Sequence, residues 1–145
     1  MSYEWDFGDS TSASGQNVAH QYAAPGLYTA EVTATNSVNQ ETAATSVLVE
    51  EAISGLAAAN DGLTLLGTAT QLSATISSGS NVSYAWDFDD GESGAGAAVS
   101  HQYASPGTYT VTVTATNLVS QDSATTIVSV VEQLNWIYLP LQVKP

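Results

Sequence analysis

Four acidic side chains lie close together beside a turn, and their type and spacing come nearest to a metal site. Asp87, Asp89 and Asp90 fall within four residues, and Glu92 follows Gly91. Hard carboxylate oxygens in a loop are the ligands that Ca²⁺ prefers. The spacing differs from an EF-hand, because the glycine comes one position early and the later bidentate glutamate is missing. Asp87, Asp89 and Asp90 are therefore calcium candidates of another type.

The same carboxylates also have an interpretation without a metal. Asp87 would cap the turn through its side chain, and Asp90 would be a solvated carboxylate on the turn. The corresponding segment near the N-terminus carries fewer acids, Asp6 and Asp9. Both interpretations stay open at the level of sequence, and a calorimetric titration with Ca²⁺ distinguishes them.

Nucleophilic catalysis would need a hydroxyl or thiol beside a base. The sequence has no cysteine, and its histidines are His20 and His101. Gly8-Asp9-Ser10 is similar to the nucleophile turn of some hydrolases, but the matching segment of a later repeat is Asp89-Asp90-Gly91. We therefore interpret the serine as a turn variant, assign no catalytic residue and no cofactor, and predict that the chain is not an enzyme.

The charge balance excludes one large class of function. The 145 residues include 14 Asp and Glu but only one Lys or Arg (Lys144), so the net charge is −13. Nucleic-acid binding needs clustered basic residues to neutralise phosphates. Charged residues make up 10% of the chain and hydrophobic ones 43%, which favours a folded domain over charge-driven disorder. The apolar runs are only a few residues long, so no membrane insertion is expected.

The chain repeats itself at an offset of 81 residues. Trp5 aligns with Trp86, and the shared segments follow without a gap. They are His20-Gln21-Tyr22 with His101-Gln102-Tyr103, Pro25-Gly26 with Pro106-Gly107, and Thr33-Ala34-Thr35-Asn36 with Thr114-Ala115-Thr116-Asn117. One structural unit is therefore used twice.

The unit is built from β-strands. From Thr108 to Thr116, threonine alternates with Tyr109, Val111, Val113 and Ala115. This period of two places the apolar residues in a core and the threonines on a solvent face. Similar alternation over residues 28–34, 72–76 and 82–86, a β-branched stretch at 124–131 and intervening turn residues predict an antiparallel β-sandwich.

The motifs resemble those of the PKD (polycystic kidney disease) domain family. The second copy carries them as Trp86-Asp87-Phe88-Asp89-Asp90-Gly91 and as His101-Gln102-Tyr103 with Gly107-Thr108-Tyr109-Thr110-Val111. Asp89, and Ser10 in the first copy, stand where the family usually has glycine, both in turns. The resemblance covers about residues 1–132 and implies an immunoglobulin-like fold in extracellular and cell-surface proteins.

The signature residues also have physical roles in such a sandwich. Trp86 would fill the space between the two sheets, as large aromatic side chains do. Tyr109 follows a Pro-Gly turn, the position of a tyrosine that fastens a sandwich corner through its hydroxyl. His101, two residues before Tyr103, would hold a loop by hydrogen bonds. We expect all of these to serve the fold.

Three segments follow from the repeat. Residues 1–51 form a partial repeat (the first unit) that lacks its N-terminal strands, residues 52–132 form a complete domain (the second unit), and residues 133–145 form an apolar tail. The first unit would leave one inner face uncovered, including Trp5. We expect truncation of a longer array, or cover by the tail at Leu134–Leu141 or by a partner chain in a strand-sharing oligomer.

The residues predict a non-catalytic module, and the resemblance to the PKD family implies an extracellular one. It would act as a spacer, stalk or adhesion unit that contacts other domains of a larger surface or secreted protein. The alternative is a module that binds a polysaccharide or protein ligand, in a calcium-dependent or calcium-independent way. Exposed aromatic residues on one face would favour the alternative, and a uniform Thr/Ser face would favour the spacer. Asn81-Val82-Ser83 also matches an N-glycosylation sequon.

Overall fold

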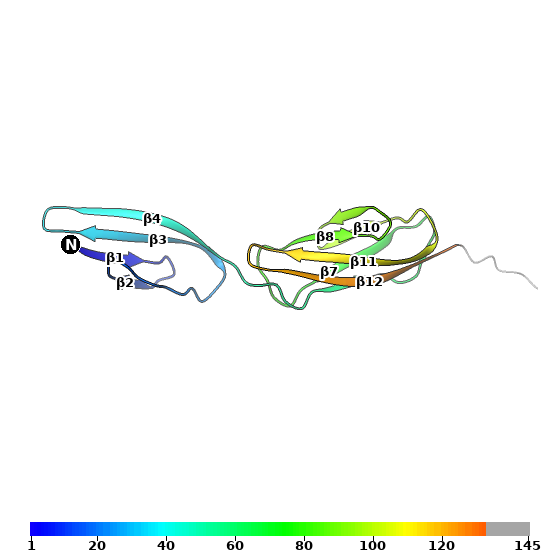
Figure 1. The fold of residues 1–145 in the computed structure, drawn as a ribbon, viewed down its shortest axis with the longest axis horizontal. Helices are drawn as coiled ribbons and strands as arrows, with labels where there is room; N and C mark the ends of the chain where they lie inside the picture. Colours follow the sequence, from blue (N-terminus) through cyan, green and yellow to red (C-terminus); the bar gives the residue numbers. More distant parts are fainter. Residues whose placement is uncertain (133–145) are drawn as a thin grey trace, which may run out of the picture.

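Residues 1–132, which the computed structural model describes, form strands β1–β12 and no helix. The two units lie end to end along the long axis of the molecule (Figure 1). The strands of the first unit are β1 (Ser2–Asp6), β2 (Ser12–Ser14), β3 (Gly26–Thr35) and β4 (Gln40–Val49). The second unit contains β5 (Ala57–Asn60), β6 (Thr64–Leu65), β7 (Thr70–Thr75), β8 (Ser83–Asp87), β9 (Ser93–Ala95), β10 (Ala98–His101), β11 (Gly107–Thr116) and β12 (Gln121–Val131).

The second unit is a two-sheet sandwich, which confirms the predicted fold. One sheet has the order β6-β12-β11-β8-β9 and the other β10-β7-β5. The pairings are antiparallel, except that β6 runs parallel to the end of β12. The last strand begins at Gln121, earlier than the β-branched stretch at 124–131 indicates, because residues 121–123 pair with Thr114–Thr116 of β11.

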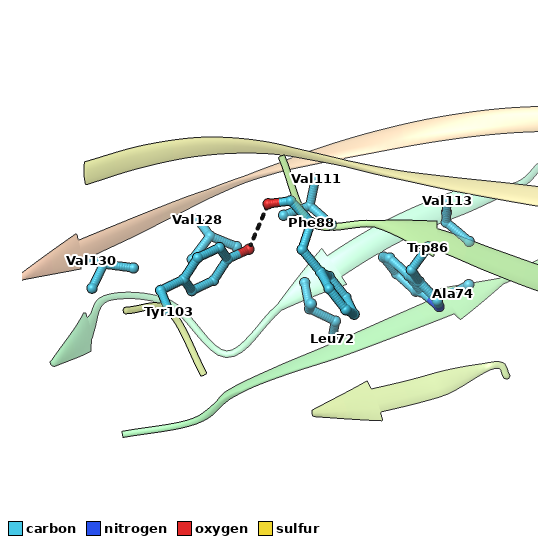
Figure 2. Close-up of a cluster of buried hydrophobic side chains, with 9 residues drawn as sticks. All are labelled: Leu72, Ala74, Trp86, Phe88, Tyr103, Val111, Val113, Val128 and Val130. Atoms are coloured by element: carbon cyan, nitrogen blue, oxygen red, sulfur yellow. Dashed lines mark hydrogen bonds between the residues drawn. The ribbon is translucent and has the colours of Figure 1, made fainter. Parts of the chain in front are cut away.

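Alternation along the strands sets the core of the second unit. Val111, Val113 and Ala115 of β11 are fully buried, while the intervening Thr112 and Thr114 are half-buried on the other face of the strand. Thr70, Leu72 and Ala74 of β7 face them from the opposite sheet. The buried apolar cluster is shown in Figure 2 and comprises Leu72, Ala74, Trp86, Phe88, Tyr103, Val111, Val113, Val128 and Val130.

Trp86 fills the space between the two sheets, as predicted. Its side chain is 2% exposed, and its Nε1 donates a hydrogen bond to the carbonyl of Gly96 at 2.9 Å. The indole is therefore buried without leaving its polar atom unpaired. The hydrogen bond also holds the loop between β9 and β10 against the core.

The first unit is a single sheet of order β2-β1-β3-β4. Its register repeats that of the second unit, since Trp5 pairs with Val32 as Trp86 pairs with Val113. Within residues 1–132, the first unit has no strands that correspond to β5, β7 and β10. The division into a partial first copy and a complete second copy stays a prediction, and the predicted cover by Leu134–Leu141 lies outside the described residues.

Candidate functional site

The acidic loop of the second unit lies between β8 and β9. The Asp87 carboxylate accepts a hydrogen bond from the Asp89 N–H at 3.0 Å, which is the predicted turn cap. The Asp89 carboxylate accepts one from the Thr110 N–H of β11 at 2.8 Å, and that of Asp90 accepts one from the Glu92 N–H at 3.0 Å. Each of the three calcium candidates thus already accepts a hydrogen bond from a backbone N–H.

Residues 1–132 contain no group of three His, Asp or Glu side chains placed to hold a metal ion. The calcium site at Asp87, Asp89 and Asp90 therefore stays a prediction. Its coordination would compete with the hydrogen bonds that hold the loop.

The prediction that Asp90 is only a solvated carboxylate on the turn is wrong, because its side chain contacts His101. Its Oδ2 lies 2.7 Å from Nε2 of His101, and the side chains are 19% and 6% exposed. Desolvation acts to raise the pKa of Asp90, but hydrogen bonds from His101 and from the Glu92 N–H keep this pKa below its ordinary value. The sequence does not indicate that His101 is the partner of Asp90, because the two residues are eleven positions apart and strand β9 and most of β10 separate them.

The first unit contains the same pair. Asp9 aligns with Asp90, and its Oδ2 lies 2.7 Å from Nε2 of His20. The pKa of Asp9 is lowered, first by a hydrogen bond from the Thr11 hydroxyl and then by His20. The Thr11 hydroxyl also lies 3.4 Å from Nε2 of His20, and each histidine contacts the carboxylate of a loop, an arrangement that we call the carboxylate–imidazole brace.

An aromatic ladder continues from each histidine into the corner of its unit. In the second unit, Phe88 stacks on His101 at 4.0 Å, His101 meets the edge of Tyr103 at 4.6 Å, and Tyr103 stacks on Tyr109 at 4.1 Å. The Tyr109 hydroxyl donates to the Ser105 carbonyl at 2.9 Å, which confirms the predicted corner tyrosine. The ladder serves packing, as its position in the core indicates.

Tyr103 lies at the centre of this ladder and is 2% exposed. Its hydroxyl donates to the Phe88 carbonyl at 3.2 Å. Desolvation raises the pKa of Tyr103 to about 12, with a smaller contribution from the Asp90 charge. The phenol is therefore a neutral structural donor at physiological pH.

Two residues in left-handed backbone conformation mark the turns where glycine is usual in the family. Ser10 has φ of 72° and aligns with Gly91 at 90°, and Asp89 has φ of 65° and aligns with Gly8 at 77°. Both are turn variants, as predicted. Asp89 gains its hydrogen bond from Thr110 at this position, while Ser10 is exposed.

The joint between the units is held by residues that sequence patterns did not single out. The Glu50 carboxylate accepts hydrogen bonds from Nδ2 of Asn81 at 3.2 Å and from the Leu118 N–H at 2.9 Å. The Glu51 N–H donates to the Ser80 hydroxyl at 2.8 Å, and the Glu51 carbonyl accepts from Nδ2 of Asn117 at 2.7 Å. In the sequence, the one indication that Asn117 has a role here is that it recurs as Asn36 at the repeat offset of 81 residues. The linker is therefore bound to two turns of the second unit, and the sequon residue Asn81 is one of the donors.

A groove runs along the uncovered face of the first unit. It measures about 450 Å³ and is lined by mostly apolar side chains. We call it the first-unit groove, and its lining residues are Trp5, Phe7, Gln16, Asn17, Val18, His20, Tyr22, Ala30, Thr45 and Val47. A second hollow of about 170 Å³ continues past Trp5 and Thr45 to Val32 and Ala43.

No helix capable of crossing a bilayer occurs in residues 1–132.

Comparison with known proteins places the chain in a family. Residues 56–130 match the model of the PKD domain, and residues 1–50 match a second model that is also described as a PKD domain. Human polycystin-1 is 35% identical over 127 residues, covering 84% of this chain and 3% of that protein. Polycystin-1-like protein 1 of Oryzias latipes is 28% identical over 137 residues, covering 92% and 5%. The chain thus spans a small part of these relatives.

Solved structures support the fold. The PKD domain from human VPS10 domain-containing receptor SorCS2 has a TM-score of 0.51 at 19% identity, covering 82% of this chain and 99% of that one. The amphioxus IgVJ-C2 molecule has a TM-score of 0.53 at 12% identity, covering 88% and 87%. With its two model matches in tandem and its immunoglobulin-like sandwich, the chain belongs to the PKD domain family.

Proposed function

We propose that the chain is a non-catalytic spacer or interaction unit within a larger extracellular or cell-surface protein. The observation that carries the proposal is the joint, where Glu50 and Glu51 bind the second unit through four hydrogen bonds. A spacer has to keep its domains at a set distance, and an unfastened linker of two residues would allow them to pivot. A further bond from the Ile53 N–H to the Ser120 hydroxyl, at 2.8 Å, extends this attachment.

Family membership supports the absence of catalysis in this proposal. PKD and immunoglobulin-like domains are generally non-catalytic modules. The two histidines are each paired with a carboxylate, and the ladder residues of the second unit lie within or beside the core. In this proposal, these groups stabilise the fold.

The matched relatives support a larger parent protein. This chain covers 3% of human polycystin-1 and 5% of the Oryzias latipes protein, so most of each relative lies outside the match. We propose that other domains of the parent protein are the immediate neighbours of this module, and that the parent protein is exposed on the cell surface or secreted.

Residual dipolar couplings of the two units would test the spacer role. A fastened joint predicts one common alignment tensor for both units in the intact chain. Glu50→Ala removes both carboxylate contacts and should give two different tensors, while Glu41→Ala, an exposed carboxylate of β4, should change nothing. Separate tensors in the unsubstituted chain would contradict the proposal.

The alternative role is binding of a protein or polysaccharide ligand. The uniform threonine face of β11 favours the spacer, while the partly exposed Trp5 favours a ligand site on the first unit. A calcium-dependent form of this role would use Asp87, Asp89 and Asp90. Calorimetric titration tests it, because absence of heat at millimolar Ca²⁺ removes the cation from the proposal.

A further inference from the structure

Exposed apolar side chains gather on the outer face of the five-stranded sheet, at the end of the second unit that is remote from the joint. We call them the outer patch and define it by Leu63, Leu65, Ile127 and Val131. We propose that the outer patch binds residues 134–141 of the same chain, the apolar part of the tail. The proposal concerns the second unit and does not depend on a spacer role.

Strand pairing and a side-chain hydrogen bond bring the residues of the outer patch together. Strand β6 runs parallel to the end of β12, so that Leu65 lies beside Val131. Five residues before Leu65, Nδ2 of Asn60 donates a hydrogen bond to the Ile127 carbonyl at 2.9 Å. Residues 60–65 therefore follow the edge of β12 from Ile127 to Val131, and their side chains are neighbours of those on β12.

Alternation turns the side chains of the outer patch toward the outside. Thr64 is 5% exposed and lies between the sheets, so its neighbours Leu63 and Leu65 lie on the other face, where they are 67% and 44% exposed. On β12, Ile127 is 63% exposed next to the fully buried Val128. A group of exposed apolar side chains of this kind marks a surface for interaction.

The last strand of the first unit has polar residues at two positions of the outer patch. At the repeat offset of 81 residues, Ile127 and Val131 correspond to Ser46 and Glu50. Glu50 accepts hydrogen bonds from the second unit at the joint. Apolar residues thus stand at these positions in the copy that the tail follows, and polar residues in the copy that the linker follows. This difference connects the outer patch with the segment that comes next in the chain.

Chain length restricts which apolar surface residues 134–141 can reach within their own molecule. From Val131 to residue 141, a fully extended chain spans at most about 36 Å. Strand β12 alone, with 11 residues, covers roughly 33–36 Å between the tail and the joint. The exposed pair Leu27 and Leu48 and the face that contains Trp5 lie beyond the joint, in the first unit (Figure 1). Within one chain, the outer patch is the apolar surface in reach.

The outer patch and residues 134–141 match in polarity. The segment reads Leu-Asn-Trp-Ile-Tyr-Leu-Pro-Leu and carries no charged residue. The outward residues of β12 are also uncharged, in a protein with a net charge of −13; they are Ser123, Thr125, Ile127, Ser129 and Val131. An uncharged segment can therefore cover this face without desolvating a carboxylate. Because the segment is joined to the end of β12, its effective concentration at the outer patch is high and only a short loop has to close.

Trp136 lies within the segment and reports its position in an NMR experiment on the full chain. We expect nuclear Overhauser effects between the Trp136 ring and the methyl groups of Leu65 and Ile127. A water-soluble paramagnetic agent should broaden the Trp136 ring resonances several-fold less than those of the same tryptophan in a free peptide of residues 133–145, because the outer patch covers one side of the ring.

Two variants separate binding at the outer patch from a general effect of removing surface leucines. Leu65→Ser combined with Ile127→Ser should lower the ratio of bound to unbound tail at least about tenfold, because two apolar contacts are lost. The first unit carries Ser46 at the position of Ile127, so a serine fits this strand. Leu27→Thr removes a leucine that is 73% exposed, introduces the residue found at Thr108, and should leave the Trp136 signals unchanged.

Circular dichroism shows whether both variants keep the β fold. The proposal is overturned when Trp136 of the unsubstituted chain is as accessible to the paramagnetic agent as it is in the free peptide. Equal effects of the two variants on Trp136 also overturn it. So do Overhauser effects between the Trp136 ring of one chain and the methyl groups of a differently labelled chain, because the tail would then bind a second copy.

Discussion

Trp5 and Trp86 occupy equivalent positions in two copies of one sheet and make the same hydrogen bond to a glycine carbonyl, yet only Trp86 is covered by a second sheet. Their Nε1 atoms lie 3.0 Å and 2.9 Å from the carbonyls of Gly15 and Gly96. The molecule therefore contains its own control for the effect of burial on an otherwise matched residue.

Substitution of each tryptophan by alanine should have unequal effects. Trp86→Ala leaves a cavity between two packed sheets and should lower the free energy of unfolding of the second unit by about 3–5 kcal/mol. Trp5→Ala removes a half-covered side chain and should cost the first unit about 1–2 kcal/mol. Hydrogen exchange resolved by residue measures both units in one sample. Equal losses would show that Trp5 is covered in solution.

The brace between Asp90 and His101 should make the second unit sensitive to acid. The pKa of Asp90 is lowered from 3.8 in the folded state, so its stabilising contribution is fully present above pH 3.8 and is lost as the pH falls through the folded-state pKa. Asp90→Asn should therefore lower stability at neutral pH and flatten the decline of stability below about pH 4. Urea unfolding between pH 7 and pH 2 measures this, with the exposed Asp61→Asn as control. An unchanged acid decline in Asp90→Asn would refute the role of the brace.

Two substitutions in the turn after β1 should change the stability of the first unit in opposite directions, because one removes a side chain at a left-handed residue and the other adds one. Ser10→Gly relieves a left-handed conformation and should stabilise the first unit by about 1 kcal/mol. Gly8→Ala should destabilise it by about 1–3 kcal/mol, because a Cβ there would lie 2.6 Å from the Thr29 carbonyl oxygen. Thermal unfolding of the two variants checks both signs, and a stabilising Gly8→Ala would contradict the turn geometry.

Tyr22 and Tyr103 make equivalent hydrogen bonds, one partly exposed to water and one buried, and removal of each hydroxyl should destabilise its unit by a different amount. Tyr103→Phe leaves the Phe88 carbonyl without its buried donor and should cost about 1–3 kcal/mol. Tyr22→Phe affects the corresponding bond to Phe7 in a half-exposed site, where water can replace the donor, and should cost about 0.5–1 kcal/mol. Denaturant unfolding followed separately for each unit provides the measurement. A larger cost at Tyr22 would mean that the groove is filled.

Several features of the fold were predictable because their causes are local or repeated. The alternation around Val111 and Val113 indicated which strand face is buried, and the structure places both residues at 0% exposure. The offset that aligns Trp5 with Trp86 indicated two copies, and the strand registers agree. Alternation needs only the pleat of a strand, and the repeat needs only a comparison of the sequence with itself.

The candidate site was harder to predict, since its contacts join polar residues that follow no periodic pattern. Glu50 bonds to Asn81 and to Leu118, which are 31 and 68 positions away. The sequence suggests a solvated carboxylate at Asp90, whereas the return of β10 beside the loop brings Nε2 of His101 to 2.7 Å from the Asp90 Oδ2. A polar side chain does not specify its partner, because any donor in reach can serve.

The amino-acid sequence by itself determined that this protein is a doubled β unit with an aromatic core, and it determined which faces of the strands are apolar. Only the tertiary structure decided which of those faces is covered, which loops the histidines brace and how the linker is attached to the second unit. The physical reason is that alternation of residue types follows from the backbone of a single strand. Burial of a face and the pairing of polar groups depend instead on segments that are distant in the chain.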